Sequence, residues 1–208
     1  MLALLSALAL SSCSSVNGMM GGTSDAQALA GLKWDYTDHA ISVDWRAAKQ
    51  LNAFDGEPHA VAIVVVQTSD PNVFRKASAT PAQLSQLLLA STSPTGVLDM
   101  QRLFVQPGET GQVWLARAEA AQYVGVVVGY YGLQPDLDAR FFRIGVKVAS
   151  KGMMVKTRTA APEPLSISLD LGQDGLLGGE SGVAPAAAAP KAASGGQIPL
   201  ASPAQAAP

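Results

Sequence analysis

The sequence predicts a mainly β protein, an antiparallel β-sandwich with one or two short helical insertions. Apolar and polar residues alternate in several short segments, which is the pattern of strands with one buried face. Turn-forming pairs such as Asp-Gly and Pro-Gly separate these segments, and only one segment has a clear helical pattern. Short strands joined by turns favour a sandwich over a helical bundle or an alternating α/β fold.

The expected strands are distributed along most of the chain. Alternating residues predict strands with one buried face at 41–45, 113–115, 142–148 and 165–171. The segments 60–66 and 123–131 are apolar at consecutive positions, so both faces of these strands should be covered and they should lie centrally in a sheet. Gly125 and Gly129 fall inside the second of these runs and are expected to permit close packing.

One helix is expected after residue 80. Thr80 suits the N-cap position, Pro81 the first helical position, and Gln83 completes a capping-box pattern. Three leucines then recur at helical spacing: Leu84, Leu87 and Leu88. This apolar stripe must face a core.

The only cysteine, Cys13, follows an uncharged apolar stretch and the pair Ser11-Ser12. Such a sequence resembles the lipobox of bacterial lipoproteins, which implies cleavage before Cys13 and acylation of its thiol and new amine. The apolar stretch has the length of a signal peptide and is too short to span a bilayer. The usual basic residues are missing before it, so we expect the true start to lie upstream of Met1.

These features divide the chain into four parts. We expect a signal peptide at 1–12, the lipidated Cys13 with a flexible tether at 13–33, and a folded β-sandwich domain at 34–177. The Ala/Pro-rich segment 178–208 offers little bulky apolar surface and is expected to be a disordered tail.

Composition and motifs argue against several classes of protein. The 14 basic and 16 acidic residues nearly balance, which gives no basic face for nucleic acid. A single cysteine permits neither an intramolecular disulfide nor a cysteine-based zinc site. His39 and His59 have no neighbours at metal-ligand spacing, and Asp136 and Asp138 lie in a Pro-containing loop where we expect them to be solvated. We therefore expect no catalytic residues, no cofactor and no metal.

Five aromatic residues gather near the expected strand ends: Trp34, Tyr36, Trp45, Tyr130 and Tyr131. They could line a ligand groove, but large aromatic side chains at strand ends more often close a sandwich core. We favour the core.

Several local patterns together resemble one family, the type VI secretion outer-membrane lipoproteins (the TssJ/SciN/VasD family). These patterns are the loop 51–59, the apolar strand and turn at 60–74, the turn Val105-Gln106-Pro107-Gly108-Glu109, and the segment 116–131. Their order and spacing, with the lipobox, carry the resemblance over about 34–177. Val66-Gln67-Thr68 departs from the Tyr-Gln-Leu strand ending that is frequent in the family, and the C-terminal tail lies outside the pattern.

The resemblance implies a transthyretin-like β-sandwich anchored by acylated Cys13 to the inner leaflet of the outer membrane and facing the periplasm. It implies an adaptor rather than an enzyme. The partner would be the periplasmic C-terminal region of the inner-membrane protein TssM, within the envelope-spanning membrane complex.

The family's partner contact maps onto the loop between the first two strands. The expected partner-binding residues are Leu51, Asn52, Ala53, Phe54, Asp55 and Gly56. Phe54 is a large apolar side chain at a turn, which suits a binding anchor. The alternative, that Phe54 folds back as a lid on the sandwich, is equally compatible with the sequence.

Two other functions remain open at this stage. One is a lipoprotein adaptor of another envelope machine, similar to a secretin pilotin, which would share the lipid anchor. The other is a periplasmic β-sandwich that binds a small ligand through its aromatic residues.

Overall fold

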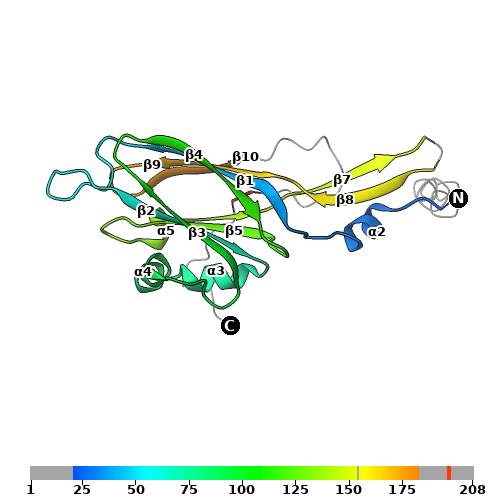
Figure 1. The fold of residues 1–208 in the computed structure, drawn as a ribbon, viewed down its shortest axis with the longest axis horizontal. Coiled ribbons are helices and arrows are strands. Elements are labelled where there is room, and N and C mark those ends of the chain that lie inside the picture. The colour runs from blue at the N-terminus through cyan, green and yellow to red at the C-terminus, as the bar shows by residue number, and fades with distance from the viewer. Residues whose placement is uncertain (1–20, 154, 183–195, 198–208) are drawn as a thin grey trace, which may run out of the picture.

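The computed structural model describes residues 21–153, 155–182 and 196–197. Two β-sheets face each other and form a sandwich, and a two-stranded ribbon projects from one end (Figure 1). The first sheet has the order β10-β9-β1-β4. Its strands are β1 (Thr37–Ala47), β4 (Thr110–Arg117), β9 (Leu165–Leu171) and β10 (Leu176–Gly182). The predicted mainly β fold is confirmed.

The second sheet has the order β11-β6-β5-β2-β3. Its strands are β2 (Val61–Thr68), β3 (Val97–Val105), β5 (Tyr123–Val128), β6 (Ala139–Arg143) and β11 (Gly196–Gln197). All its pairings are antiparallel, whereas in the first sheet β1 runs parallel to β9, with Ile41 opposite Leu165. A parallel pair requires a long connection, and four strands of the second sheet (β2, β3, β5 and β6) lie along the chain between β1 and β9.

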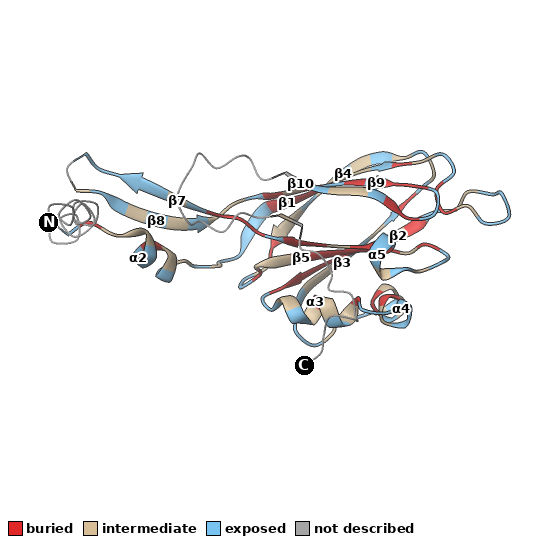
Figure 2. Cartoon of the chain, turned by 180° about the vertical axis from the view of Figure 1, so that it is seen from behind, coloured by how far each residue is buried: buried red, intermediate tan, exposed pale blue. Residues whose placement is uncertain are grey.

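The main core fills the space between the two sheets. The first sheet contributes alternating side chains such as Ile41, Val43 and Ile167, all fully buried. The second contributes Ile63 and Val126 from the opposite side. Burying one such side chain stabilises the fold by about 1.5–3 kcal/mol relative to leaving it exposed. Figure 2 shows that the buried segments are concentrated in these strands.

A second core covers the outer face of β2 and β5. Helix α3 (Pro71–Ala77) places Phe74 there, and α4 (Pro81–Leu89) adds Leu84 and Leu87. The two strands are therefore buried on both faces, as their unbroken apolar sequences predict. The Thr80 hydroxyl accepts from the Gln83 amide at 3.3 Å and so caps α4 as expected.

Gly125 lies where α3 meets β5. A Cβ atom at this position would overlap the ring of Phe74, which stacks on Phe141 at 5.0 Å between ring centroids. The expectation that a glycine here permits close packing is confirmed.

Replacing Gly125 with alanine is expected to lower the free energy of unfolding by about 2 kcal/mol, because the Phe74 ring must move within a filled core. Urea unfolding of the variant measures this loss. Gly132→Ala serves as the control, since a Cβ there would meet nothing within 4 Å. Equal stability of the two variants would contradict the proposed packing.

The strand expected at 142–148 is instead two strands in different sheets. β6 ends at Arg143, and β7 (Val146–Lys151) leaves the sandwich and pairs with β8 (Thr157–Pro162). Between them the Ile144 amide donates to the Gln122 carbonyl at 2.9 Å, which fixes the change of direction. Ile144 and Val146 are both buried, so apolar and polar residues continue to alternate across the break between β6 and β7. The sequence pattern therefore could not show the break.

Part of the expected flexible tether is an ordered helix, α2 (Asp25–Ala30). Its N-cap, Ser24, forms a capping box with Gln27. The segment docks on the β7–β8 ribbon: the Thr23 amide donates to the Lys156 carbonyl at 3.0 Å, and Arg158 pairs with Asp25 at 2.8 Å. The folded part therefore begins earlier than residue 34.

The folded part also extends beyond residue 177. β10 continues to Gly182 along β9, and Gly196 and Gln197 pair with β6. These strands correct the boundary of the expected disordered tail. Its segments 183–195 and 198–208 lie outside the described residues, as do Cys13 and the expected signal peptide.

Asp138 closes the short helix α5 (Pro135–Asp138) and is fully buried, which corrects the expectation of a solvated carboxylate. Burial raises its pKa from 3.8 to about 6, although a hydrogen bond from the Gln134 amide and the charge of Arg140 oppose the shift. Folding therefore favours the protonated carboxyl. This contribution to stability is complete below pH 4 and is lost as the pH rises through about 6.

Asp138→Asn mimics the protonated carboxyl at every pH. At pH 8 the variant should be more stable than the native chain by about 3 kcal/mol, because the pKa rises by about two units and each unit corresponds to about 1.4 kcal/mol. At pH 4 the two should be nearly equal. Denaturant unfolding at both pH values measures the difference. A variant that is less stable at pH 8 would show that the ionised carboxylate is instead satisfied.

Candidate functional site

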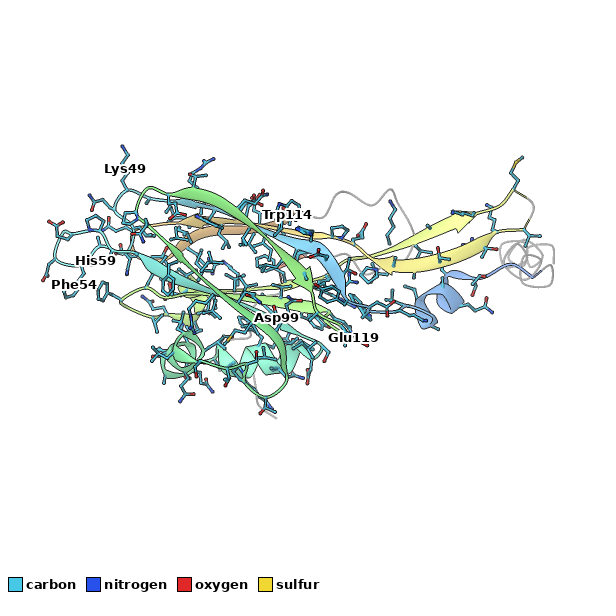
Figure 3. All side chains as sticks on the ribbon, viewed as in Figure 1. Lys49, Phe54, His59, Asp99, Trp114 and Glu119 are labelled. Carbon is cyan, nitrogen blue, oxygen red and sulfur yellow. The ribbon has the colours of Figure 1, made fainter. Side chains whose placement is uncertain are left out.

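The loop between β1 and β2, residues 48–60, forms the end of the sandwich opposite the β7–β8 ribbon (Figure 1). We call it the distal loop. It contains all six residues that the sequence proposes as partner-binding. Phe54 and His59 lie at this end in Figure 3.

The tip of the distal loop is a tight hairpin. Phe54 and Glu57 exchange two backbone hydrogen bonds of 2.9 and 3.0 Å. The two residues between them, Asp55 and Gly56, have φ values of 51° and 82°. Positive φ at both central positions defines a type I′ turn, for which Asp-Gly is a preferred sequence. The tip is therefore held in one conformation.

The base of the loop is anchored in the sandwich. Leu51 is fully buried in the main core, and its carbonyl accepts from the His59 amide at 2.9 Å. Asn52 is also buried, and its Oδ1 accepts from the Tyr131 amide at 2.9 Å. Leu51 and Asn52 thus position the loop, while Phe54, Asp55 and Gly56 form its exposed part.

Phe54 does not fold back onto the core. Its side chain is 53% exposed and stacks on the ring of Tyr131, which is 59% exposed, with centroids 4.8 Å apart. The ring of His59 meets Tyr131 edge-on at 5.4 Å. We call these three residues the aromatic stack. The rings of Phe54 and Tyr131 remain half-exposed because no other element of the described residues covers them.

Tyr131 was expected to close the core, and that expectation is wrong. Its neighbour Tyr130 is buried, and its hydroxyl donates to the Gly172 carbonyl at 3.2 Å. Adjacent residues of an extended segment point in opposite directions, so only one of two consecutive tyrosines can enter the core. That rule, applied to the Tyr130-Tyr131 pair, was the signal in the sequence for an exposed aromatic residue beside the loop.

The aromatic stack is bordered by negative charge. Asp55 and Glu57 are exposed at the tip on either side of Gly56. Half-exposed rings beside carboxylates can receive an apolar side chain together with a basic one. The arrangement is suited to holding another surface.

The described residues contain no group of three or more His, Cys, Asp or Glu side chains that could hold a metal ion. His39 is exposed and pairs with Asp38 at 3.0 Å, away from the distal loop. No described helix is long and apolar enough to cross a membrane.

Two of the aromatic residues, Trp34 and Trp45, pack on the core as favoured and do not line a ligand groove, which was the alternative. Trp34 also lies over the guanidinium of Arg117 at 5.8 Å. Two open hollows of about 400 and 440 Å³ lie beside Arg117 and between α3 and α4, and neither has an aromatic residue in its lining.

A family model described as "Type VI secretion lipoprotein, VasD, EvfM, TssJ, VC_A0113" matches residues 39–159, which is more than half of the 208. The chain belongs to this family. The resemblance stated from the sequence is thereby confirmed. The matched region of this type VI secretion lipoprotein begins in β1, includes the distal loop and ends in β8.

Several solved structures that match the chain have titles that name components of the type VI secretion system. The chain is similar to Lip of Serratia marcescens, a membrane-bound component of the type VI secretion system, with 22% identity and a TM-score of 0.45 over 65% of this chain and 93% of that one. It is similar to the lipoprotein TssJ1 of Pseudomonas aeruginosa, with 15% identity and a TM-score of 0.44 over 73% and 98%. A chain from a structure titled for the TssM C-terminal domain from EAEC matches with 19% identity and a TM-score of 0.44 over 66% and 97%. No curated protein sequence matches.

Proposed function

We propose that the chain is an outer-membrane-anchored periplasmic lipoprotein that docks the inner-membrane component TssM and helps assemble the envelope-spanning membrane complex of a type VI secretion system. The observation that carries this proposal is the half-exposed aromatic stack on a loop of fixed conformation, in a member of a secretion lipoprotein family. The protein acts as an adaptor and not as an enzyme.

The aromatic stack provides the docking chemistry. Large aromatic side chains contribute most of the binding energy in many interfaces, provided that they reach a pocket where water is excluded. The hydrogen bonds between Phe54 and Glu57 and between Asn52 and Tyr131 fix the loop before binding. Little conformational entropy is then lost on association, which strengthens binding. Phe54 and Tyr131 enter the partner, and Asp55 pairs with a basic residue at its rim.

The anchor is Cys13, whose sequence context supports acylation. Each buried CH₂ of an acyl chain contributes about 0.8 kcal/mol, and stable attachment requires two or more chains. The described chain starts at Gly21, and α2 on the ribbon lies at the end of the molecule opposite the distal loop (Figure 1). An anchor at one end and a docking loop at the other suit a bridge between two membranes.

The direct test uses the mature chain from Cys13 as bait in a pull-down from detergent-solubilised envelope of its own bacterium. Capture of the TssM-type protein is expected, and the purified periplasmic domain of that protein should bind in calorimetry. Capture of a secretin without TssM would instead support an adaptor of another envelope machine. Stabilisation by a small ligand in a thermal-shift screen, with no protein captured, would also contradict the proposal.

A further inference from the structure

The β7–β8 ribbon, residues 146–162, has one covered face and one open face. We call it the arm. On the covered face, Arg158 pairs with Asp25 of α2, and its Nη1 donates to the Thr23 carbonyl at 3.1 Å. On the opposite face, the pairing of Lys147 with Ala161 and of Lys151 with Thr157 lines up six exposed residues: Lys147, Ala149, Lys151, Thr157, Thr159 and Ala161.

Basic residues are concentrated on the arm. It holds four of the 14 basic residues of the chain and none of the 16 acidic ones, although the whole chain has a net charge of −2. The acidic residue Asp25 is docked on the arm and pairs with Arg158 on the covered face. The open face therefore presents Lys147 and Lys151 beside small neutral residues.

The tip of the arm presents an apolar side chain to solvent. Gly152 has a φ of 105°, which permits the tight reversal after Lys151. The next residue, Met153, is 99% exposed and is the most exposed of the large hydrophobic residues described. Its flexible, unbranched side chain can enter an apolar layer at little conformational cost. The arm thus combines ammonium groups with a protruding apolar tip.

The path of the chain brings the lipid anchor close to this tip. Thr23 is hydrogen-bonded to Lys156, four residues after Gly152. Cys13 is ten residues before Thr23, so even a fully extended connection places its acyl chains within about 35 Å of the arm. If Cys13 is acylated, as the proposed function requires, the arm is held at the membrane surface.

We propose that the open face and tip of the arm bind the anionic phospholipid headgroups of the membrane in which the acyl chains of Cys13 are inserted. Lys147 and Lys151 pair with headgroup phosphates, and Met153 enters the boundary between headgroups and acyl chains. This contact rests on the proposed lipid anchor. It orients the sandwich so that the distal loop points away from the membrane.

The test measures binding of the acyl-free chain, Cys13→Ser, to sedimented vesicles. Vesicles of phosphatidylethanolamine and phosphatidylglycerol (3:1) are compared with neutral phosphatidylcholine vesicles at low salt. We expect binding only to the anionic vesicles, because each lysine near an anionic surface strengthens binding about fivefold. Adding Lys147→Gln, Lys151→Gln and Met153→Ser should weaken binding at least 20-fold.

A matched control variant removes two lysines and one exposed apolar side chain outside the arm. It carries Lys49→Gln, Lys76→Gln and Leu89→Ser, where Leu89 is also exposed. It should bind the anionic vesicles like the parent chain. Equal losses in both triple variants, or equal binding of the parent to neutral and anionic vesicles, would overturn the inference. Circular dichroism confirms that each variant is folded.

The outcome is separable from the proposed function. The arm variant should capture the TssM-type domain in solution like the parent chain, because the distal loop lies at the other end of the molecule (Figure 1). Loss of partner capture in the arm variant would assign the open face to protein binding and overturn the membrane contact. Failure of the parent chain to capture TssM would contradict the proposed function and leave the vesicle result intact.

Discussion

A chain carrying both Phe54→Ala and Tyr131→Ala is expected to bind the TssM-type periplasmic domain about 100-fold more weakly than the native chain. The change removes the two half-exposed rings of the aromatic stack and leaves the backbone of the distal loop in place. Truncating a central aromatic anchor costs about 2 kcal/mol or more, and 100-fold corresponds to about 2.7 kcal/mol. Isothermal titration calorimetry with the purified domain measures the loss.

Two other half-exposed aromatic residues provide the control. Phe104 on β3 is 66% exposed and Trp114 on β4 is 50% exposed, and both lie outside the distal loop. Phe104→Ala with Trp114→Ala removes comparable apolar surface and should leave the affinity within about twofold. If the control weakened binding as much as the stack variant, the docking surface would lie on the edge strands.

The central strands could be predicted from the sequence because both of their faces are covered. β2 and β5 lie between the main core and the helices that carry Phe74 and Leu84, so their apolar residues are consecutive. A run of consecutive apolar residues can be read directly from the sequence, so the coverage of both faces of these strands can be predicted without knowing their neighbours. The Asp-Gly turn after Phe54 could also be predicted, but whether the Phe54 side chain is exposed or folds back on the sandwich could not, because both are compatible with the turn.

Features that depend on distant partners could not be predicted in this way. The break between β6 and β7 depends on a hydrogen bond from Ile144 to Gln122, and alternation is the same on both sides of it. The burial of Asp138 depends on the packing of α5 against β10. Neither partner is adjacent in sequence, so neither leaves a local pattern.

The N-terminal helix is an intermediate case. Ser24 and Gln27 stand at capping-box spacing, so a helix start could have been recognised from the sequence. With only six residues, α2 is too short to be stable alone in water, and its contacts with β8 supply the stability. The sequence shows where the helix starts, but it does not show that the helix docks on the arm.

Cys13→Ser is expected to remove the protein from the outer-membrane fraction and to abolish type VI secretion. The serine hydroxyl cannot accept the thioether-linked lipid, so cleavage and acylation both fail. Even one acyl chain gives only marginal binding, and with none the arm contact alone is weaker still. Labelling with radioactive palmitate and fractionation of the envelope measure attachment.

The same variant separates anchoring from docking. Purified without lipid, it should bind the TssM-type domain with native affinity, since the distal loop and Cys13 lie far apart in the sequence. Within the described residues, the backbone hydrogen bonds that fix the loop involve no residue before Ala48. Ser15→Ala, two residues after Cys13, is the control and should be acylated and support secretion. A docking loop without an anchor transmits no force between membranes, so binding without secretion is the expected combination. Normal secretion by Cys13→Ser would show that the bridge does not depend on the lipid.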